Sequence, residues 1–102
     1  MPGMDEKRYR ESRLCRLLGN PVVYQLVLLL ETAGPLTPGK LAKLIGRQVS
    51  TISIHLGKLR SADVVRYDTS GKQTRYWLKH KSEMKALLRM LAMAVEASAK
   101  IK

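Results

Sequence analysis

Glycine and proline signals divide this chain into short segments, and no other feature of the sequence restricts its fold as much. Asn20-Pro21 and Thr37-Pro38 each place a capping side chain before a proline, which suits the first position of a helix. Gly34-Pro35 and Gly46 are typical of helix ends. A chain of 102 residues has material for one hydrophobic core. We therefore expect residues 1–102 to form a single domain built from short elements.

Apolar residues recur at helical spacing between these breaks. They predict helices at about 5–18, 22–33, 38–45, 48–61 and 82–99, with Ser82 as the cap of the last one. The helix at 22–33 is apolar on most sides and should lie at the centre. Gly57 costs about 1 kcal/mol inside a helix, so we expect packing to require it. The residues expected to face inward on the third and fourth helices are Leu41, Leu44, Ile45, Val49, Ile52, Leu56 and Leu59.

After residue 63 the periodicity changes toward the two-residue repeat of a strand. β-Branched and aromatic residues dominate 64–67 and 74–78, and the stretch 68–73 between them is rich in turn residues, with Gly71 at its tip. This pattern predicts a hairpin with a long loop. The expected fold class is therefore mostly α with a β-hairpin, an α+β architecture of five helices and a two-stranded wing.

Two short helices joined through a glycine turn and followed by a hairpin are typical of a winged helix-turn-helix, a DNA-binding fold. The helix at 48–61 should be the recognition helix and 64–78 the wing. The face opposite the apolar stripe presents hydroxyls for base edges, an aliphatic side chain for a thymine methyl group, and cations for phosphates. An alternative is that these side chains only solvate the surface. The candidate DNA contacts are Lys40, Arg47, Gln48, Ser50, Thr51, Ser53, Ile54, His55, Lys58, Arg66, Lys72 and Arg75.

The positive charge of the chain is concentrated where this motif lies. Lys and Arg number 19 against 8 Asp and Glu, a formal net charge of +11. Residues 40–81 carry ten basic and two acidic side chains, whereas 1–39 and 82–102 are close to neutral. An excess of this size points to an acidic partner, which is a nucleic acid, an anionic membrane or an acidic protein. Its position in the chain favours double-stranded DNA.

Several classes of function are disfavoured by what the sequence lacks. The longest apolar run, 22–30, is about half the length of a spanning helix, and the charged N-terminus does not resemble a signal peptide. A single cysteine excludes an intrachain disulfide and a cysteine-cluster zinc site. No His or Cys stands with acids in a catalytic pattern, and no Gly-rich phosphate loop precedes a helix. We expect a cytoplasmic protein with no membrane role, no cofactor and no enzymatic activity.

The stretch 41–60, LAKLIGRQVSTISIHLGKLR, resembles the ArsR/SmtB-type bacterial repressors, whose signature reads roughly L-A-x-x-L-G-x-S-Q-x-T-V-S-x-H-L-x-x-L. The likeness continues through Gly71-Lys72 and Tyr76-Trp77-Leu78 and covers about residues 10–98. It implies a homodimer in which the first and last helices pair across a two-fold axis. The last helix supports a dimer independently, because its apolar residues cover more surface than one small core can bury. The residues assigned to the dimer are Leu14, Leu17, Met84, Leu87, Leu88, Leu91 and Val95.

The chain departs from this family where related repressors sense their signals. Metal-sensing members carry a Cys-x-Cys-type pair where this chain has Thr-Pro-Gly at 37–39. Others bind zinc through Asp, His, His and Glu where it has His80, Ser82, Met93 and Glu96. Only Glu96 matches, so we expect no metal at either site. The effector to which the protein responds is not identified by the sequence. Redox-sensing members need two cysteines per chain. Because Cys15 is the single cysteine here, a redox switch would require a disulfide between Cys15 and the same residue of the second subunit of a dimer.

The recognition helix departs from the family as well. Val49 and Ile54 stand where Gln and Arg are frequent, so the family's base contacts do not carry over there, and more of the recognition falls to DNA shape. We expect a dimeric, sequence-specific transcriptional regulator, a repressor that binds a pseudo-palindromic operator through 48–61 and 64–78. The alternatives are a sequence-tolerant architectural or RNA-binding winged helix, and a winged helix whose wing docks an acidic protein.

Overall fold

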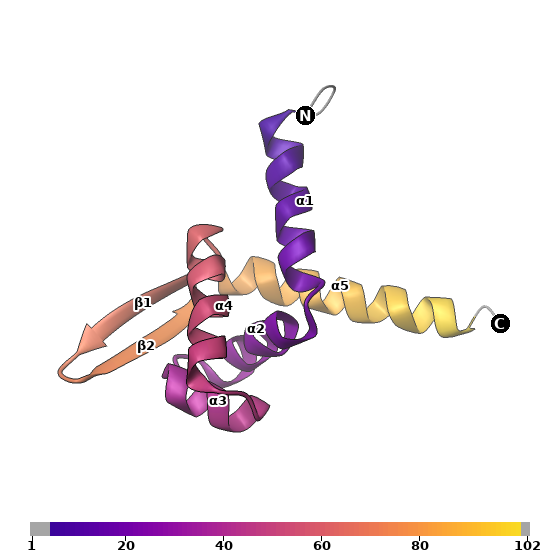
Figure 1. Cartoon of the computed structure of the whole chain (residues 1–102). Coiled ribbons are helices and arrows are strands. Elements are labelled where there is room, and N and C mark those ends of the chain that lie inside the picture. Colours follow the sequence, from indigo (N-terminus) through magenta and orange to yellow (C-terminus); the bar gives the residue numbers. More distant parts are fainter. Residues whose placement is uncertain (1–4, 101–102) are drawn as a thin grey trace.

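The computed structural model describes residues 5–100. This part of the chain contains five helices and one antiparallel pair of strands, so the expected fold class is confirmed (Figure 1). The boundaries of the expected domain, 1–102, stay a prediction, because 1–4 and 101–102 lie outside the described residues. The elements are α1 (Glu6–Leu18), α2 (Pro21–Ala33), α3 (Pro38–Ile45), α4 (Val49–Ser61), β1 (Val65–Ser70), β2 (Gln73–Leu78) and α5 (Lys81–Lys100).

The caps predicted from the sequence start α2 and α3. The Asn20 side-chain oxygen accepts hydrogen bonds from the backbone N–H groups of Val22 and Val23, at 2.9 and 3.3 Å. The Thr37 hydroxyl accepts one from the N–H of Lys40 at 3.1 Å. Each cap satisfies an N–H group that the first turn of a helix leaves without a partner. The cap at Asn20 also fixes the corner where α1 and α2 meet, at a bend of 96°.

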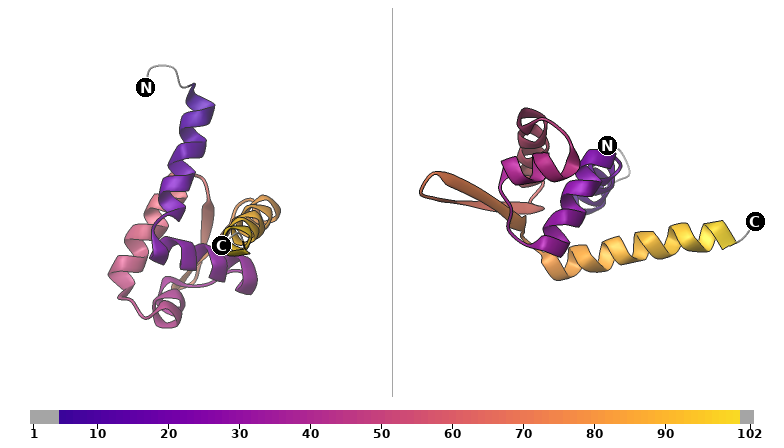
Figure 2. Two further views of the ribbon diagram at one scale, coloured as in Figure 1. Left: turned by 90° about the vertical axis from the view of Figure 1, so that its right-hand side faces the viewer. Right: turned by 90° about the horizontal axis from the view of Figure 1, so that it is seen from below.

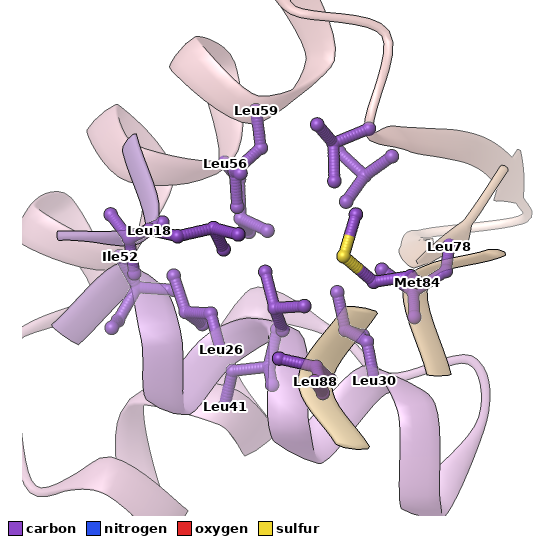
Figure 3. Packing of buried hydrophobic residues seen from close by; sticks show 14 of the residues in the cluster. Leu18, Leu26, Leu30, Leu41, Ile52, Leu56, Leu59, Leu78, Met84 and Leu88 are labelled. Carbon is purple, nitrogen blue, oxygen red and sulfur yellow. The ribbon is translucent and has the colours of Figure 1, made fainter. Parts of the chain in front are cut away.

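Side chains from all five helices and from the hairpin meet in one apolar cluster (Figure 3). α2 lies at the centre, as predicted, with Val23, Leu26, Val27 and Leu30 buried. Each buried aliphatic side chain contributes about 1.5–3 kcal/mol relative to its exposed state. The cluster therefore fixes the other elements onto α2. Its remaining members are Leu18, Leu41, Ala42, Ile52, Leu56, Leu59, Val64, Val65, Leu78, Met84 and Leu88.

The two terminal helices extend well beyond this cluster (Figures 1 and 2). In α1 only Leu18, at its last position, is buried. In α5 the buried residues among those described are Met84 and Leu88, both in its first half. Over residues 5–100, no single helix is long and apolar enough to cross a membrane; α1 and α2 meet those criteria only as a bent pair. The core thus leaves the far ends of α1 and α5 without cover from their own chain.

Two residues expected in the core are at the surface. Leu44 is 51% exposed and Val49 is 50% exposed, whereas Ala42 is buried. Val49 is the first residue of α4, so no preceding helical turn covers it. Leu44 lies near the end of the short α3, and Leu41 and Ala42 turn inward instead. Gly57 is exposed, and a Cβ atom at that position would meet no atom within 4 Å, so the expected packing reason for it is wrong.

The hairpin is longer and more tightly closed than predicted. Its strands pair in register from Val65 with Leu78 to Ser70 with Gln73, which leaves a two-residue turn, Gly71-Lys72, in place of the long loop. A hydrogen bond of 3.1 Å between the Thr69 and Thr74 hydroxyls accompanies the extra pairs. Gly71 has φ of 62°, which glycine adopts without steric cost. The prediction for Ser82 is also wrong, because α5 already begins at Lys81.

Asp63 forms the corner between α4 and the hairpin. Its φ is 65°, a left-handed conformation that Asp tolerates better than most residues. The carboxylate oxygens accept hydrogen bonds from Lys79 Nζ at 2.8 and 2.7 Å, and the hydrogen bond from Lys79 lowers the pKa of Asp63. Lys79 directly follows β2, and its backbone N–H donates to the Val64 carbonyl oxygen at 3.0 Å. These contacts tie together the two ends of the hairpin.

We expect Asp63→Asn to be less stable than the wild type at neutral pH and equally stable in acid. The folded pKa of Asp63 lies below its unfolded value of about 3.9, so the ion pair stabilises the folded state above that pH. This contribution is lost as the pH falls through the folded pKa. Thermal unfolding at low salt, at neutral pH and again near pH 2, measures the difference. A deficit of the same size at both pH values contradicts the assignment.

Candidate nucleic-acid interface

α4 presents the surface that the sequence assigned to base contacts. Ile52, Leu56 and Leu59 are fully buried and fix the helix through its inner side, beside α3 and the start of β1. At helical spacing on the other side lie Ser50, Ile54, Gly57 and Ser61, all exposed. Ile54 has the most exposed side chain of any large apolar residue on this helix, at 61%. We call these four residues the outer face of α4. Its small side chains leave room for another molecule to approach the helix backbone closely.

The other predicted contacts on α3 and α4 surround this outer face. Thr51 and His55 are half-buried. Burial, and to a lesser extent the nearby Lys58, lowers the pKa of the His55 imidazole below its usual value and so favours its uncharged form. Its Nδ1 atom is buried without a hydrogen-bond partner among the described residues. The exposed members of the predicted set are Lys40, Arg47, Gln48, Ser53 and Lys58.

The turn between α3 and α4 sets the angle at which α4 is presented. Gly46 is left-handed, with φ of 77°, and its N–H donates to the Ala42 carbonyl oxygen at 2.8 Å. The N–H of Arg47 donates to the same oxygen at 3.1 Å. Gln48 occupies the N-cap position of α4, yet its side chain makes no capping hydrogen bond. The Gln48 amide and the first N–H groups of α4 are therefore available to an outside partner.

An aromatic stack holds the wing, which is the hairpin of β1 and β2, against the end of α4. The rings of Tyr67 and Tyr76 are 5.5 Å apart between centroids, and the Arg60 guanidinium lies 4.6 Å from the Tyr67 centroid. Tyr76 is fixed in turn by two backbone hydrogen bonds with Leu36, at 2.8 and 3.0 Å. The stack thus runs from α4 through both strands to the segment before α3. Sequence reasoning treated Arg60 as one more positive charge and missed this positioning role.

The predicted wing contacts Arg66, Lys72 and Arg75 are all exposed. None of them forms an ion pair within residues 5–100, although the charge of Arg66 helps to lower the pKa of the Asp63 carboxyl. Lys72 lies in the turn at the tip of the wing. Arg75 stands opposite Asp68 in the strand register, which places an acidic side chain next to it. The structure therefore brings the predicted wing cations to one element, beside α4.

A groove that sequence reasoning missed separates α4 from α1. It has a volume of about 760 Å³ and is lined by Arg13, Arg16 and Leu17 of α1 and by Ile54, Gly57 and Lys58 of α4, among others. Arg13 and Arg16 were assigned to a nearly neutral dimerisation segment because the charge was summed along the chain. Their spacing of three residues places them on one side of α1. That spacing could have identified a cationic side of α1 from the sequence.

The residues assigned to the dimer lie in different places. Met84 and Leu88 are 8% and 6% exposed in the chain's own core, so their assignment to a free dimer surface is wrong (Figure 3). The pattern of apolar residues at helical spacing cannot separate a core position from an interface position. Leu91 and Val95 line an apolar groove of about 670 Å³ with Cys15 and Tyr24. Leu14, Leu17 and Leu87 are half-buried against the core.

The residues that stand at the family's metal-ligand positions lie on α5 or directly before it. His80 precedes α5 and Ser82 is in its first turn, both exposed, and Met93 and Glu96 lie farther along the helix. Within residues 5–100, no three side chains of His, Cys, Asp or Glu come together in a group that could hold a metal ion.

The stack on Tyr67 gives a direct prediction. We expect Tyr67→Ser to lower the free energy of unfolding by about 1–2 kcal/mol, because it removes a ring pair and a cation–π contact. Tyr67→Phe keeps the ring and should stay close to the wild type. Urea denaturation measures both variants. Equal losses in the two variants would show that the hydroxyl group, and not the stack, carries the effect.

Comparison with known proteins places these features among related molecules. Residues 18–68 match the sequence model of a family described as a helix-turn-helix domain. The transcriptional repressor BigR from Xylella fastidiosa is 34% identical over 83% of this chain and 90% of that chain, with a TM-score of 0.67. The cadmium metal-sensor CmtR from Mycobacterium tuberculosis is 33% identical over 76% of this chain and 80% of that chain, with a TM-score of 0.64.

A third similar structure shares the fold at lower sequence identity. It is the homodimeric winged helix-turn-helix DNA-binding domain Mb0332 from Mycobacterium bovis, described as a possible ArsR-family transcriptional regulator. Its sequence is 21% identical over 95% of this chain and 93% of that chain, with a TM-score of 0.77. No curated protein sequence matches the chain.

Proposed function

The chain belongs to the ArsR-type family of winged helix-turn-helix DNA-binding transcriptional regulators, and we propose that it is a dimeric repressor of a pseudo-palindromic operator. In such a dimer the two copies of α4 enter successive major grooves about 34–36 Å apart, and each wing contacts the adjacent backbone. The homodimeric state is stated for Mb0332, and repression for BigR; both properties are proposals for this chain.

The observation that carries the proposal is the placement of α4. Three fully buried side chains hold its inner side, and the outer face offers only hydroxyls, a glycine and Ile54. Hydroxyls can hydrogen-bond to base edges and an aliphatic side chain can contact a thymine methyl group. The wing cations Arg66, Lys72 and Arg75 lie beside this face for the phosphates.

We propose that the signal to which this repressor responds is not a metal ion at either of the two family positions. Residues 37–39 supply no thiolates, and of the four residues on and before α5 only Glu96 matches the ligand that the zinc-binding members have at the same position. Cadmium sensing is stated for CmtR, and this chain lacks the residues to adopt it at those positions.

The dependence of DNA binding on salt tests the proposal. A dimer that neutralises six or more phosphates should give a slope of about −5 or steeper in a plot of log Kobs against log salt concentration. We expect Lys72→Ala and Arg75→Ala each to reduce this slope by about one per protomer, for every duplex sequence. Fluorescence anisotropy on the chain's own promoter and on a random duplex measures both. If Lys72→Ala and Arg75→Ala show the same salt slope as the wild type, the wing is not part of the interface.

A second candidate function is sequence-tolerant DNA binding. Val49 and Ile54 are 50% and 61% exposed and cannot hydrogen-bond to bases, which favours a protein that binds through backbone charge and DNA shape. The two candidates differ in the affinity ratio between the promoter and random sequence. Equal affinity for both duplexes supports the second candidate and contradicts the first.

The proposed dimer makes a separate prediction. Leu91 and Val95 are 37% and 71% exposed on the apolar groove beside α1, so we expect Leu91→Asp or Val95→Asp to produce monomers. Burying an unpaired carboxylate in an apolar interface costs several kcal/mol. Leu44→Asp, at an apolar residue on α3 whose 51% exposure lies between those of Leu91 and Val95, is the matched control and should stay dimeric. Light scattering reports the mass, and dimers from both α5 variants would place the interface elsewhere.

A further inference from the structure

We propose that Arg13 and Arg16 of α1, together with Lys58 of α4, form a second phosphate-binding element, which contacts the DNA backbone on the side of α4 opposite the wing. This inference rests on the proposed DNA-binding function and extends it to a helix that the sequence assigned only to dimerisation. The groove between α1 and α4, described above, is the site.

The groove is continuous with the surface that faces DNA. Ile54, Gly57 and Ser61 belong to the outer face of α4 and also line the groove. A duplex that seats the outer face in its major groove therefore brings one of its two backbones to the opening of this groove. The wing stands on the other side of α4, where Arg60 meets Tyr67 (Figures 1 and 2).

The charges in the groove are not used within the chain. Arg13, Arg16 and Lys58 are exposed and form no ion pair or hydrogen bond through their side chains within residues 5–100. Elsewhere on α1 the pattern differs, because Arg8 pairs with Glu11 at 2.8 Å. No Asp or Glu of the described part of the chain lines the groove. Three cations without a neutralising acid give the groove a positive potential, which attracts an anion.

The shape of the groove allows a backbone to approach. Gly57 is exposed on its wall, and a Cβ atom there would meet nothing within 4 Å, so packing within the chain does not require glycine. Glycine in a helix interior costs about 1 kcal/mol relative to alanine. The open space at Gly57 admits a phosphate group beside Lys58. The half-buried His55 contributes an uncharged ring to the same wall.

The test is a pair of double variants with equal loss of charge. Arg13→Gln/Arg16→Gln removes the groove cations. Lys7→Gln/Arg10→Gln removes two cations that line a separate groove, between the other side of α1 and the start of α5. Gln keeps the helix propensity of Arg and Lys. Each lost phosphate contact reduces the salt slope by about 0.9, so we expect a reduction of about 1.8 per protomer for the first variant only. Its affinity for every duplex should fall about tenfold.

The outcomes separate this inference from the proposed function. If the wild type binds duplex DNA with a steep salt slope and both double variants match it, the groove proposal is wrong and the proposed function stands. If the wild type binds no duplex, the proposed function fails first. Equal reductions in both variants would show a general charge effect and overturn the assignment to this groove. Circular dichroism and thermal unfolding should be unchanged in both variants, because the four side chains are exposed.

The two histidines of the chain supply an independent readout. His55 lies in the proposed groove and His80 lines the groove toward α5, so their imidazole NMR signals report on the two sides of α1. Saturating duplex DNA should shift the His55 signals more in the wild type than in Arg13→Gln/Arg16→Gln, and leave those of His80 unchanged in both. Inorganic phosphate alone should give no saturable shift of His55 at millimolar concentration. Saturable binding of phosphate would show a site for a free anion and overturn the assignment to DNA backbone.

Discussion

The burial of one side of α4 is the constraint on which the rest of this structure depends. Ile52, Leu56 and Leu59 have no exposed surface, and they join the cluster built on α2. Replacing one such leucine by alanine costs about 2–5 kcal/mol, a large part of the stability of a small domain. α4 therefore cannot rotate about its axis without unfolding the core. Its outer face is fixed, and every functional statement about this chain depends on that orientation.

Weaker contacts fix the neighbours of α4 relative to it. The left-handed Gly46 sets its start, and the Asp63–Lys79 ion pair and the Arg60–Tyr67–Tyr76 stack set the wing at its end. Exposed contacts of these kinds stabilise a fold less than the buried side chains of α4 do. They orient the wing, whose base is also held in the core by Val65 and Leu78.

The sequence predicted those features that depend on neighbouring residues in the chain. Asn20-Pro21 and Thr37-Pro38 mark the starts of α2 and α3 because a cap and its N–H partners are two or three residues apart. The likeness at 41–60 identified the motif, and the family comparisons confirmed it. Gly46 was recognised as a turn for the same local reason.

Features that depend on contacts between distant segments could not be predicted. Helical spacing cannot tell a residue of the core from one of an interface, so Met84 and Leu88 were misplaced and the exposure of Val49 and Leu44 was missed. The length of the hairpin turn depends on strand pairing between Ser70 and Gln73, residues that single-residue propensities assign to a loop. The groove between α1 and α4 arises where Arg13 and Lys58, 45 positions apart in the sequence, line the same space.

A map of phosphate contacts on the bound operator tests the central claim, that a fixed α4 reads the major groove between two cationic flanks. Ethylation interference on the chain's own promoter identifies each phosphate that must be unmodified for binding. The structure predicts two clusters related by a two-fold axis, about one helical turn apart, each with sensitive phosphates on both sides of one major-groove segment. Interference spread evenly along the duplex, or confined to one side of the groove, would contradict this account.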